Sequence, residues 1–89
     1  MKNVIIQGSE IFSIADIHEK LMDELGFPEY YGMNLDALHD CLTDIFEETC
    51  ISIVGSNEAS EKFGADFDRF MQVLNDAAEE NDNLYIIEL

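Results

Sequence analysis

Three aspartates recur at every fourth position in the stretch YYGMNLDALHDCLTDIF, residues 30–46. In a helix, Asp36, Asp40 and Asp44 form an acidic row along one side. Like charges at this spacing destabilise an isolated helix by about 0.2–0.5 kcal/mol per pair. The last two also approach the negative end of the helix dipole, where carboxylates are disfavoured. We therefore expect the acidic row to bind a cationic partner.

The chain supplies few basic residues to neutralise this row. It has 20 Asp and Glu against 4 Lys and Arg, a net charge of −16, and no Lys or Arg lies between residues 22 and 61. Such a charge repels phosphate backbones and anionic membranes, so nucleic acid and membrane are poor partners. It attracts a basic protein, because the field raises the encounter rate and fixes orientation. Solubility alone is the other explanation of the general acidity.

Two tyrosines, Tyr30 and Tyr31, precede the acidic row in a loop that also contains Pro28 and Gly32. Tyrosine beside carboxylates is typical of protein interfaces, because the ring buries area while the hydroxyl keeps a hydrogen bond. The structural alternative is a ring packed beneath the loop. We expect one ring to be exposed and the other to be buried.

Metal binding is a second chemistry open to this stretch. Asp36, His39 and Asp40 stand at i, i+3 and i+4, where carboxylates and an imidazole can ligate a divalent ion from one helix face. Catalysis has less support, because the chain has no nucleophile with an adjacent base, no glycine-rich phosphate loop and no HExxH motif. We expect no enzyme activity, cofactor or metal, with the metal site kept as a rival hypothesis. His18 is expected on a helix surface.

The cysteines and the first residues bear on the cellular compartment. Cys41 and Cys50 are the only cysteines, too few for a disulfide framework or a cysteine-based zinc site. The stretch MKNVIIQGSEIF has one Lys and no small-residue cleavage site, and no segment approaches the ~18 apolar residues of a membrane-spanning helix. We expect a cytoplasmic protein with reduced, buried thiols.

Composition and apolar patterning indicate one globular α/β domain, residues 1–89. Hydrophobic residues make up 47% of the chain and charged residues 27%, a balance that favours a packed core. Three apolar runs rich in β-branched residues predict strands that other elements cover, at residues 4–6, 51–54 and 84–89. The long connections between them contain helices, which favours right-handed parallel crossovers.

Three helices and a short helical turn are predicted between these strands. Ser13 and Asp16 form a capping box before a helix at 14–25, which Gly26 ends. Asn34 caps the second helix, and the third begins after Gly64 and frays at 81–83. The expected apolar face of the second helix comprises Leu35, Leu38, Leu42, Ile45 and Phe46, with Glu47 on the acidic side. With a short turn at 57–62, the order is β-α-α-β-(α)-α-β, a three-stranded parallel sheet packed with three to four helices.

The motif PEYYGMNLDALHDCLTDIFE, residues 28–47, resembles the barstar family, whose members are intracellular inhibitors of secreted barnase-like ribonucleases. The resemblance is carried by PEYYG, NLDAL and DCLT in register. It covers essentially the full chain, because the strand runs and the last helix also match. It implies a barstar-like fold, a monomeric free protein, and a 1:1 complex with a basic ribonuclease.

The resemblance also implies a site in which the second helix and the preceding loop plug the active site of the nuclease. Asp40 matches the carboxylate that occupies a substrate-phosphate position, and Asp36 matches a second interface acid. Further implied contacts are Tyr30, Asn34, Thr43, Glu47 and, on the last helix, Asp76. The chain departs from the family by having His39 and Ile45 at two aromatic positions and Asp44 at a glycine. His39 and Asp44 belong to the expected partner-binding set.

The expected function is inhibition of a barnase-like extracellular ribonuclease by carboxylates that mimic RNA phosphates. The alternative is an acidic interaction module that binds a basic partner other than a nuclease. The departures at His39 and Ile45 leave open which ribonuclease is bound.

Overall fold

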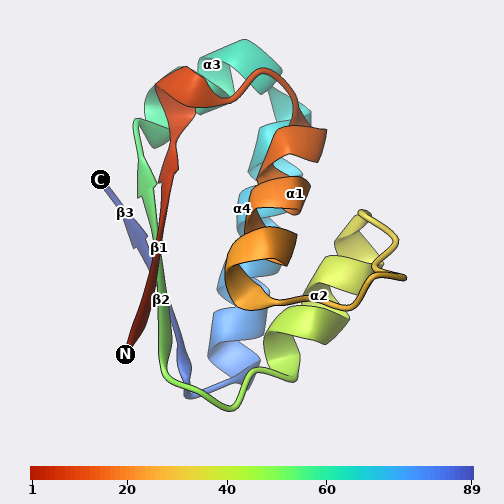
Figure 1. Ribbon diagram of the computed structural model, residues 1–89. Coiled ribbons are helices and arrows are strands. Elements are labelled where there is room, and N and C mark those ends of the chain that lie inside the picture. The colour runs from red at the N-terminus through yellow and green to blue at the C-terminus, as the bar shows by residue number, and fades with distance from the viewer.

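The computed structural model describes residues 1–89 and contains a three-stranded parallel sheet with helices against one of its faces (Figure 1). The elements are β1 (Lys2–Gln7), the 3-10 turn η1 (Gly8–Glu10), α1 (Ile14–Leu25), α2 (Leu35–Thr43), β2 (Thr49–Val54), α3 (Ser56–Phe63), α4 (Ala65–Glu80) and β3 (Leu84–Glu88). The expected α/β fold is confirmed, and the short turn at 57–62 is part of a complete helix, α3. No helix is both long enough and apolar enough to cross a membrane.

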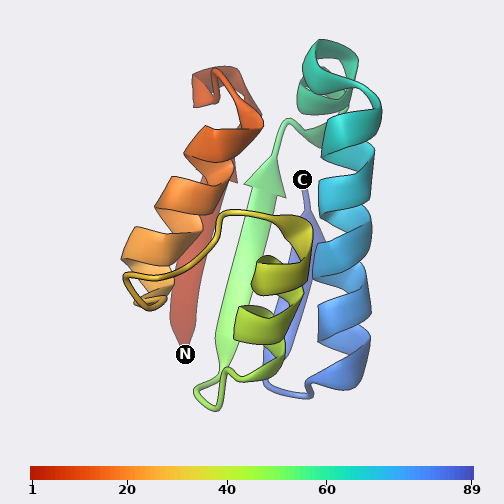
Figure 2. The same ribbon diagram turned by 90° about the vertical axis from the view of Figure 1, so that its right-hand side faces the viewer.

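The order of the strands, which the sequence did not predict, is β1-β2-β3 with both pairs parallel. Helices α1 and α2 connect β1 to β2, and α3 and α4 connect β2 to β3. Both connections step the same way across the sheet, so right-handed crossovers place their helices on the same face. Figure 2 shows α1 over β1, α4 towards β3 and α2 in front of them. The opposite face of the sheet carries no helix (Figure 1).

The core lies between the sheet and these helices. Alternate strand residues point into it, while their neighbours face the uncovered side of the sheet. Its largest fully buried side chains are Ile6, Ile17, Leu21, Leu38, Leu42, Ile51, Ile53, Phe67, Phe70 and Leu74. Leu38 and Leu42 attach α2 to the rest of the molecule at i, i+4 spacing, each contributing about 1.5–3 kcal/mol on burial. The side of α2 opposite to them therefore faces solvent.

Local capping signals place the ends of α1 and the start of α2 where the sequence predicts them. The Ser13 Oγ accepts a hydrogen bond from the Asp16 N–H at 3.3 Å, and the Ser13 N–H donates to the Asp16 carboxylate at 3.2 Å. Gly26 adopts a left-handed conformation with φ 69°, which glycine permits without strain. The Asn34 Oδ1 accepts from the Ala37 N–H at 2.9 Å and caps α2.

The end of α2 differs from the prediction. The apolar periodicity continues to Phe46, but the helix ends at Thr43, Ile45 is half-buried, and the Phe46 side chain is 90% exposed. The Asn81 side-chain amide donates to the Leu42 and Ile45 carbonyls at 2.9 and 2.8 Å. These two hydrogen bonds occupy carbonyl oxygens that would accept backbone N–H groups if α2 continued. Glu47 consequently lies in the loop after α2, and not on the helix.

Candidate functional site

The acidic row is exposed and has no cationic partner within the chain. The ion pairs of the structure are Lys20–Glu24, Arg69–Asp66 and His39–Glu80. Asp36 lies in the first turn of α2, where the helix dipole stabilises a carboxylate. Asp44 caps the other end, where the dipole disfavours one. The row thus presents carboxylates to solvent without local neutralisation.

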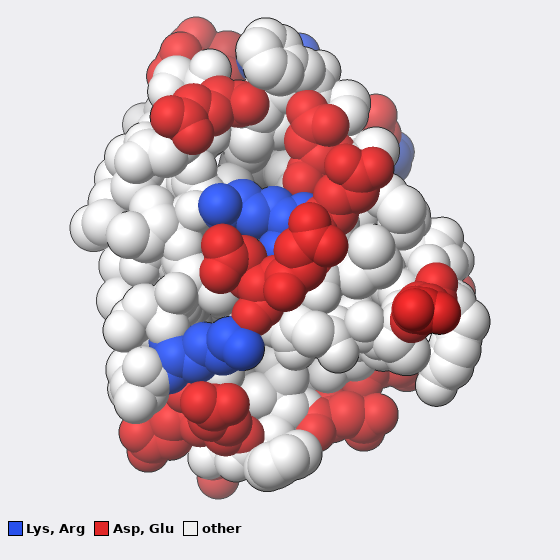
Figure 3. Space-filling model, in the orientation of Figure 1, with Lys and Arg blue, Asp and Glu red and all other residues white.

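Acidic residues are not confined to α2. In Figure 3 a band of Asp and Glu side chains (red) runs across the face on which α1 lies, and Lys or Arg side chains (blue) lie directly beside it. Glu19, Asp23 and Glu24 are the exposed acids of α1, and only Glu24 is paired with a lysine. Acidity alone therefore does not locate a binding site, and the other features around α2 are needed.

The loop before α2 holds one tyrosine in the core and presents the other to solvent, as predicted. Tyr31 is 8% exposed, and its hydroxyl oxygen lies 2.5 Å from the His18 Nδ1 in a hydrogen bond. The Tyr31 ring also meets the Phe27 ring edge-on, with centroids 5.0 Å apart. Burial raises the pKa of Tyr31 and keeps its hydroxyl protonated. Tyr31 thereby anchors the loop, and Tyr30, which is 81% exposed, is presented beside the acidic row.

His18 was expected on the surface of α1, and this expectation is wrong. Its side chain is 4% exposed and meets the Phe70 ring edge-on, with centroids 5.4 Å apart. Position 18 follows Ile14 by four residues and precedes Leu21 by three, so it belongs to the apolar stripe of the helix. The hydrogen bond to Tyr31 supplies the polar partner that burial of an imidazole requires. His18 is therefore a positioning residue for the loop that carries Tyr30.

Acidification is expected to destabilise the fold through His18. Burial lowers the pKa of His18 below its ordinary value of 6.5, so the unfolded chain takes up a proton at a higher pH than the folded protein does. Stability therefore falls as the pH drops from the ordinary pKa of 6.5 towards the lowered folded pKa, and His18 contributes no pH dependence well above that interval.

Urea unfolding at pH about 7.5 and about 5.5 measures this effect, with His18→Gln as the control that keeps polarity but does not titrate near neutral pH. The wild type should lose more unfolding free energy than the variant between the two pH values. An equally large loss of unfolding free energy in His18→Gln would show that His18 does not cause this pH dependence.

The structure places His39 against α4. The His39 Nε2 is hydrogen-bonded to the Glu80 carboxylate. No group of three or more His, Cys, Asp or Glu side chains is arranged to hold a metal ion. Asp76 lies one turn before Glu80 on the same side of α4, and its carboxylate accepts a bond from Gln72 at 2.8 Å. The acidic surface thus extends from α2 onto α4.

Two of the expected contact residues have roles within α2 itself. Asn34 caps its first turn, as described. The Thr43 hydroxyl bonds to the His39 and Asp40 carbonyl oxygens at 3.0 and 3.1 Å, within the last turn. Both lie at the ends of the helix that carries the acidic row.

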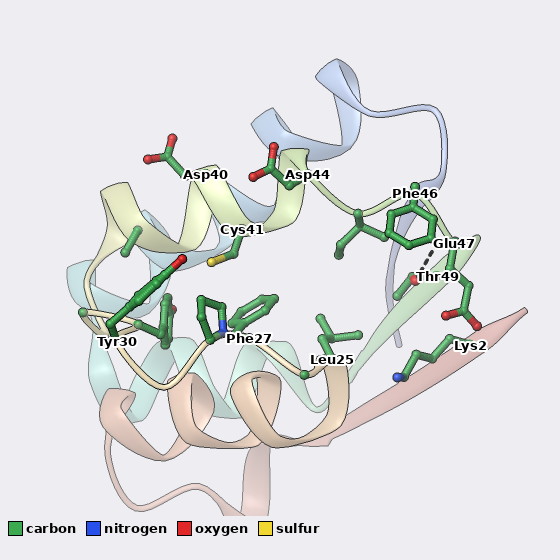
Figure 4. A pocket seen from close by; sticks show the side chains of 16 residues that line it. Lys2, Leu25, Phe27, Tyr30, Asp40, Cys41, Asp44, Phe46, Glu47 and Thr49 are labelled. Carbon is green, nitrogen blue, oxygen red and sulfur yellow. Dashed lines mark hydrogen bonds between the residues drawn. The ribbon is translucent and has the colours of Figure 1, made fainter.

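A hollow of about 700 Å³, here called the α2 groove, lies between α2, the loop after α1 and the loop after α2 (Figure 4). Its apolar lining includes Leu25, Phe27 and Ile45, all half-buried. Its lining also includes Lys2, Tyr30, Asp40, Cys41, Asp44, Phe46, Glu47 and Thr49. No sequence pattern predicted this groove, because three separate segments form it and Phe46 was assigned to the core.

The two cysteines are free thiols in different surroundings. Cys50 is buried, as expected, but Cys41 is only half-buried, because it lines the α2 groove. Burial, and then the neighbouring Asp44 and Asp40 carboxylates, raise the pKa of the Cys41 thiol. The thiol of Cys41 is therefore kept protonated, which disfavours reactivity as a nucleophile.

Asn81 is a further residue that sequence reasoning missed. It was assigned to a fraying helix end, yet it is 8% exposed and ties the end of α4 to the end of α2. Its Oδ1 also accepts from the Asn83 N–H at 3.0 Å. It fixes the position of Asp44, and no local pattern indicates a partner nearly forty residues away.

Comparison with known proteins identifies the family. The family model described as Barstar (barnase inhibitor) matches residues 1–87. The chain belongs to the barstar family. A relative from Bacillus subtilis (strain 168), named "Putative ribonuclease inhibitor YrdF", is 40% identical over 81 residues, which cover 90% of this chain and 89% of that protein. The barstar resemblance of residues 28–47 is therefore confirmed at the level of the whole chain.

The three positions at which the resemblance implies a departure, His39, Asp44 and Ile45, lie in or beside the acidic row. His39 pairs with α4, Asp44 caps α2, and Ile45 lines the α2 groove. These three residues thus form part of the surroundings of the Asp36 and Asp40 carboxylates.

Proposed function

We propose that this protein inhibits a barnase-like extracellular ribonuclease by covering its active site with α2 and the loop before it. Membership of a family of barnase inhibitors supports an inhibitor rather than an enzyme. The observation that carries the proposal is the acidic row, exposed and unpaired beside the exposed Tyr30. A ribonuclease holds RNA phosphates with Arg and Lys side chains, and carboxylates presented to those cations compete with RNA.

The residues of the site take different roles in this proposal. Asp40, in the middle of the row, occupies a phosphate position, and Asp36 meets a second cation. Tyr30 supplies buried contact area, because its ring is free to pack against the nuclease. The contact set is completed by Asn34, His39, Thr43, Asp44, Glu47 and Asp76.

The overall charge acts on the rate of association. A net charge of −16 attracts a basic enzyme over distances comparable to the Debye length, about 8 Å at physiological salt. The short-range contacts of Asp36, Asp40 and Tyr30 then set the lifetime of the complex. We place the inhibitor in the cytoplasm, as a monomer that forms a 1:1 complex.

A basic protein that is not a nuclease is the second candidate partner. The acidic band over α1 favours it, because this band extends the negative surface beyond the α2 site (Figure 3). A test of RNA cleavage separates the two candidate partners. If the partner is a ribonuclease, the purified protein must stop RNA cleavage by that enzyme; if the partner is another basic protein, it need not.

Titration of a purified barnase-like ribonuclease with the protein tests the proposal. RNA cleavage should fall linearly and stop near one equivalent, because a tight 1:1 inhibitor is consumed stoichiometrically. Asp23→Ala, which removes a carboxylate from α1, is the matched control and should inhibit as the wild type does. Full activity in the presence of a large excess of the protein at low salt would refute the proposal.

Salt is expected to have opposite effects on the free protein and on its complex. Raising sodium chloride from about 0.05 to about 0.5 M screens repulsion among the acids, so the melting temperature of the free protein should rise. The same screening weakens attraction to the nuclease, so the association rate should fall. Thermal unfolding and stopped-flow association measure the two effects. A melting temperature that falls with added salt would contradict the predicted stabilisation of the free protein. An association rate that does not change with salt would contradict the predicted electrostatic attraction to the nuclease.

A further inference from the structure

The face of the sheet that carries no helix is apolar and lies outside the α2 site (Figure 1). Ile5, Tyr85, Ile87 and Leu89 lie on this side, and their exposed fractions are 53%, 44%, 44% and 70%. These four are half of the large hydrophobic residues that the fold leaves exposed. Folding therefore leaves apolar surface concentrated in water on the side of the sheet opposite to the helices, as is typical of interaction surfaces.

The strand register brings these residues into one patch, here called the open sheet face. Ile5 pairs with Ser52, and Ser52 pairs with Ile87, so these three residues form the middle row of the face. Leu89 extends β3, because its N–H donates to the Ile53 carbonyl at 2.8 Å. The open sheet face comprises Asn3, Ile5, Gln7, Cys50, Ser52, Val54, Tyr85, Ile87 and Leu89.

The open sheet face has no charged side chain, although charged residues make up 27% of the chain. A strongly basic or acidic partner therefore finds no opposite charge on it, and the net charge of −16 repels anionic membranes. A second copy of the chain does match this face. Two uncharged faces can meet while the helices, with the acidic row and the acids of α1, point away from each other (Figures 1 and 2).

The geometry of a parallel sheet allows such a contact. Two sheets that meet face to face pack ~10 Å apart, with their strand directions within about 30° of each other. A twofold arrangement places the middle row of one copy over the middle row of the other, because this row is at the centre of both faces. Ile5 and Ile87 of both copies would then leave water.

The size of the open sheet face limits the strength of this contact. Three strands about 4.8 Å apart, each of about six residues at ~3.3 Å per residue, span roughly 15 by 20 Å, or about 300 Å² of plane. This lies below the ~800 Å² that each partner contributes to a stable protein–protein interface. The contact is therefore weak and reversible, with a dissociation constant on the order of 0.1 mM, as expected of interfaces below the standard size.

We propose that the open sheet face is a self-association surface through which two copies of this chain form a weak twofold dimer at high concentration. Both α2 sites stay accessible in the dimer, because they lie on the helix side of each sheet (Figure 2). Each chain therefore still binds one nuclease, and the dilute protein is the monomer of the proposed 1:1 complex. The dimer does not depend on the proposed function.

Sedimentation equilibrium of the purified protein over concentrations from about 0.01 to about 1 mM tests for the dimer, because self-association follows mass action. A reducing buffer prevents cross-links through Cys41 and Cys50. The mean mass should rise from that of one chain towards that of two. A mass that stays at one chain at the highest protein concentration, in about 0.5 M sodium chloride, would overturn the proposal.

The salt dependence of the dimer identifies the kind of contact. Raising sodium chloride from about 0.05 to about 0.5 M should strengthen association, because it screens the repulsion between two chains of net charge −16. Contacts between opposite charges respond in the reverse direction. A dimer that weakens as salt is added would therefore rule out the uncharged face.

Ile5→Lys tests the position of the contact. A lysine in the middle row of both copies should raise the dissociation constant about tenfold or more, because burying an unpaired charge is costly. It also makes the net charge of −16 less negative by one, which by itself favours association. Phe46→Lys is the matched control: it makes the same charge change at a 90% exposed residue on the helix side and should not weaken the dimer.

A second variant and the melting temperature guard against loss of the fold. Ile5 is 53% exposed, so Ile5→Lys should still unfold cooperatively near the wild-type melting temperature. Leu89→Lys, at the 70% exposed end of β3, should also weaken the dimer. If both folded variants dimerise as the wild type does, or if Phe46→Lys alone abolishes the dimer, the contact lies elsewhere and the proposal is overturned.

Discussion

Asp40→Ala is expected to weaken inhibition of the ribonuclease about 30-fold to several thousand-fold. Asp40 lies in the middle of the acidic row, is exposed, and has no ion-pair partner in the chain. In the proposed complex it is desolvated against cations that otherwise hold a phosphate. Truncating one member of such a buried charge pair costs about 2–5 kcal/mol, a range to which barstar-family complexes themselves contribute. Each 1.4 kcal/mol corresponds to about tenfold in affinity.

Inhibition constants from tight-binding kinetics measure this effect. Asp40→Asn should lose nearly as much as Asp40→Ala, because the amide keeps the shape of the side chain but removes its charge. Asp23→Ala on α1 is the control for a general loss of negative charge. The melting temperature of Asp40→Ala should equal or exceed that of the wild type, since one like-charge repulsion is removed. An unchanged inhibition constant for Asp40→Ala would remove Asp40 from the site.

The substitution with the largest expected effect on stability is Asn81→Asp, at about 3 kcal/mol or more. Asn81 is 8% exposed, and its amide donates to the Leu42 and Ile45 carbonyls at 2.9 and 2.8 Å. An ionised carboxylate has no proton to donate and would face these oxygens with a negative charge. Each buried acceptor left unsatisfied costs about 1–3 kcal/mol, and more where charge is involved.

Urea unfolding of Asn81→Asp and Asn81→Ala separates these contributions. Alanine removes the donors alone, so it should destabilise the fold less than aspartate does. Asn75→Asp makes the same chemical change at an exposed position of α4 and should change the unfolding free energy by less than about 0.5 kcal/mol. Equal stability of Asn75→Asp and Asn81→Asp would show that the amide does not hold the end of α2.

Features with a local cause could be predicted from the sequence. The capping box of Ser13 and Asp16, the cap at Asn34 and the left-handed Gly26 each depend on neighbours within a few residues. The apolar spacing of Leu38 and Leu42 is likewise local, and it fixes which side of α2 carries the acidic row. The solvent-facing position of Asp36, Asp40 and Asp44 could therefore be predicted from the apolar periodicity of α2 alone.

Features set by distant contacts could not be predicted. The apolar pattern continues through Ile45 and Phe46, but the bonds from Asn81 end α2 before them. The α2 groove forms only where three segments of the chain meet, and none of these segments has a sequence pattern that predicts a groove. Strand order depends on which way each crossover steps, which no local pattern encodes.

His18 is a different case. Its position in the helix indicates burial, whereas its polar residue type led to the wrong prediction of a surface site. It stands at i+4 from Ile14 in the apolar stripe of α1, which indicates burial. A polar residue in such a stripe is buried when a partner is available, and Tyr31 is thirteen residues further along the chain. The same contact decides which of the two tyrosines is exposed.

Competition between the protein and RNA for the nuclease tests the central claim most directly. The claim is that the acidic row takes the place of RNA phosphates in the active site. The inhibition constant of the wild-type protein should be measured with a short RNA substrate at concentrations below and above its KM. The apparent constant should rise in proportion to substrate concentration once this exceeds KM, because the two ligands exclude each other. An apparent constant that is independent of substrate concentration would contradict occupation of the phosphate positions.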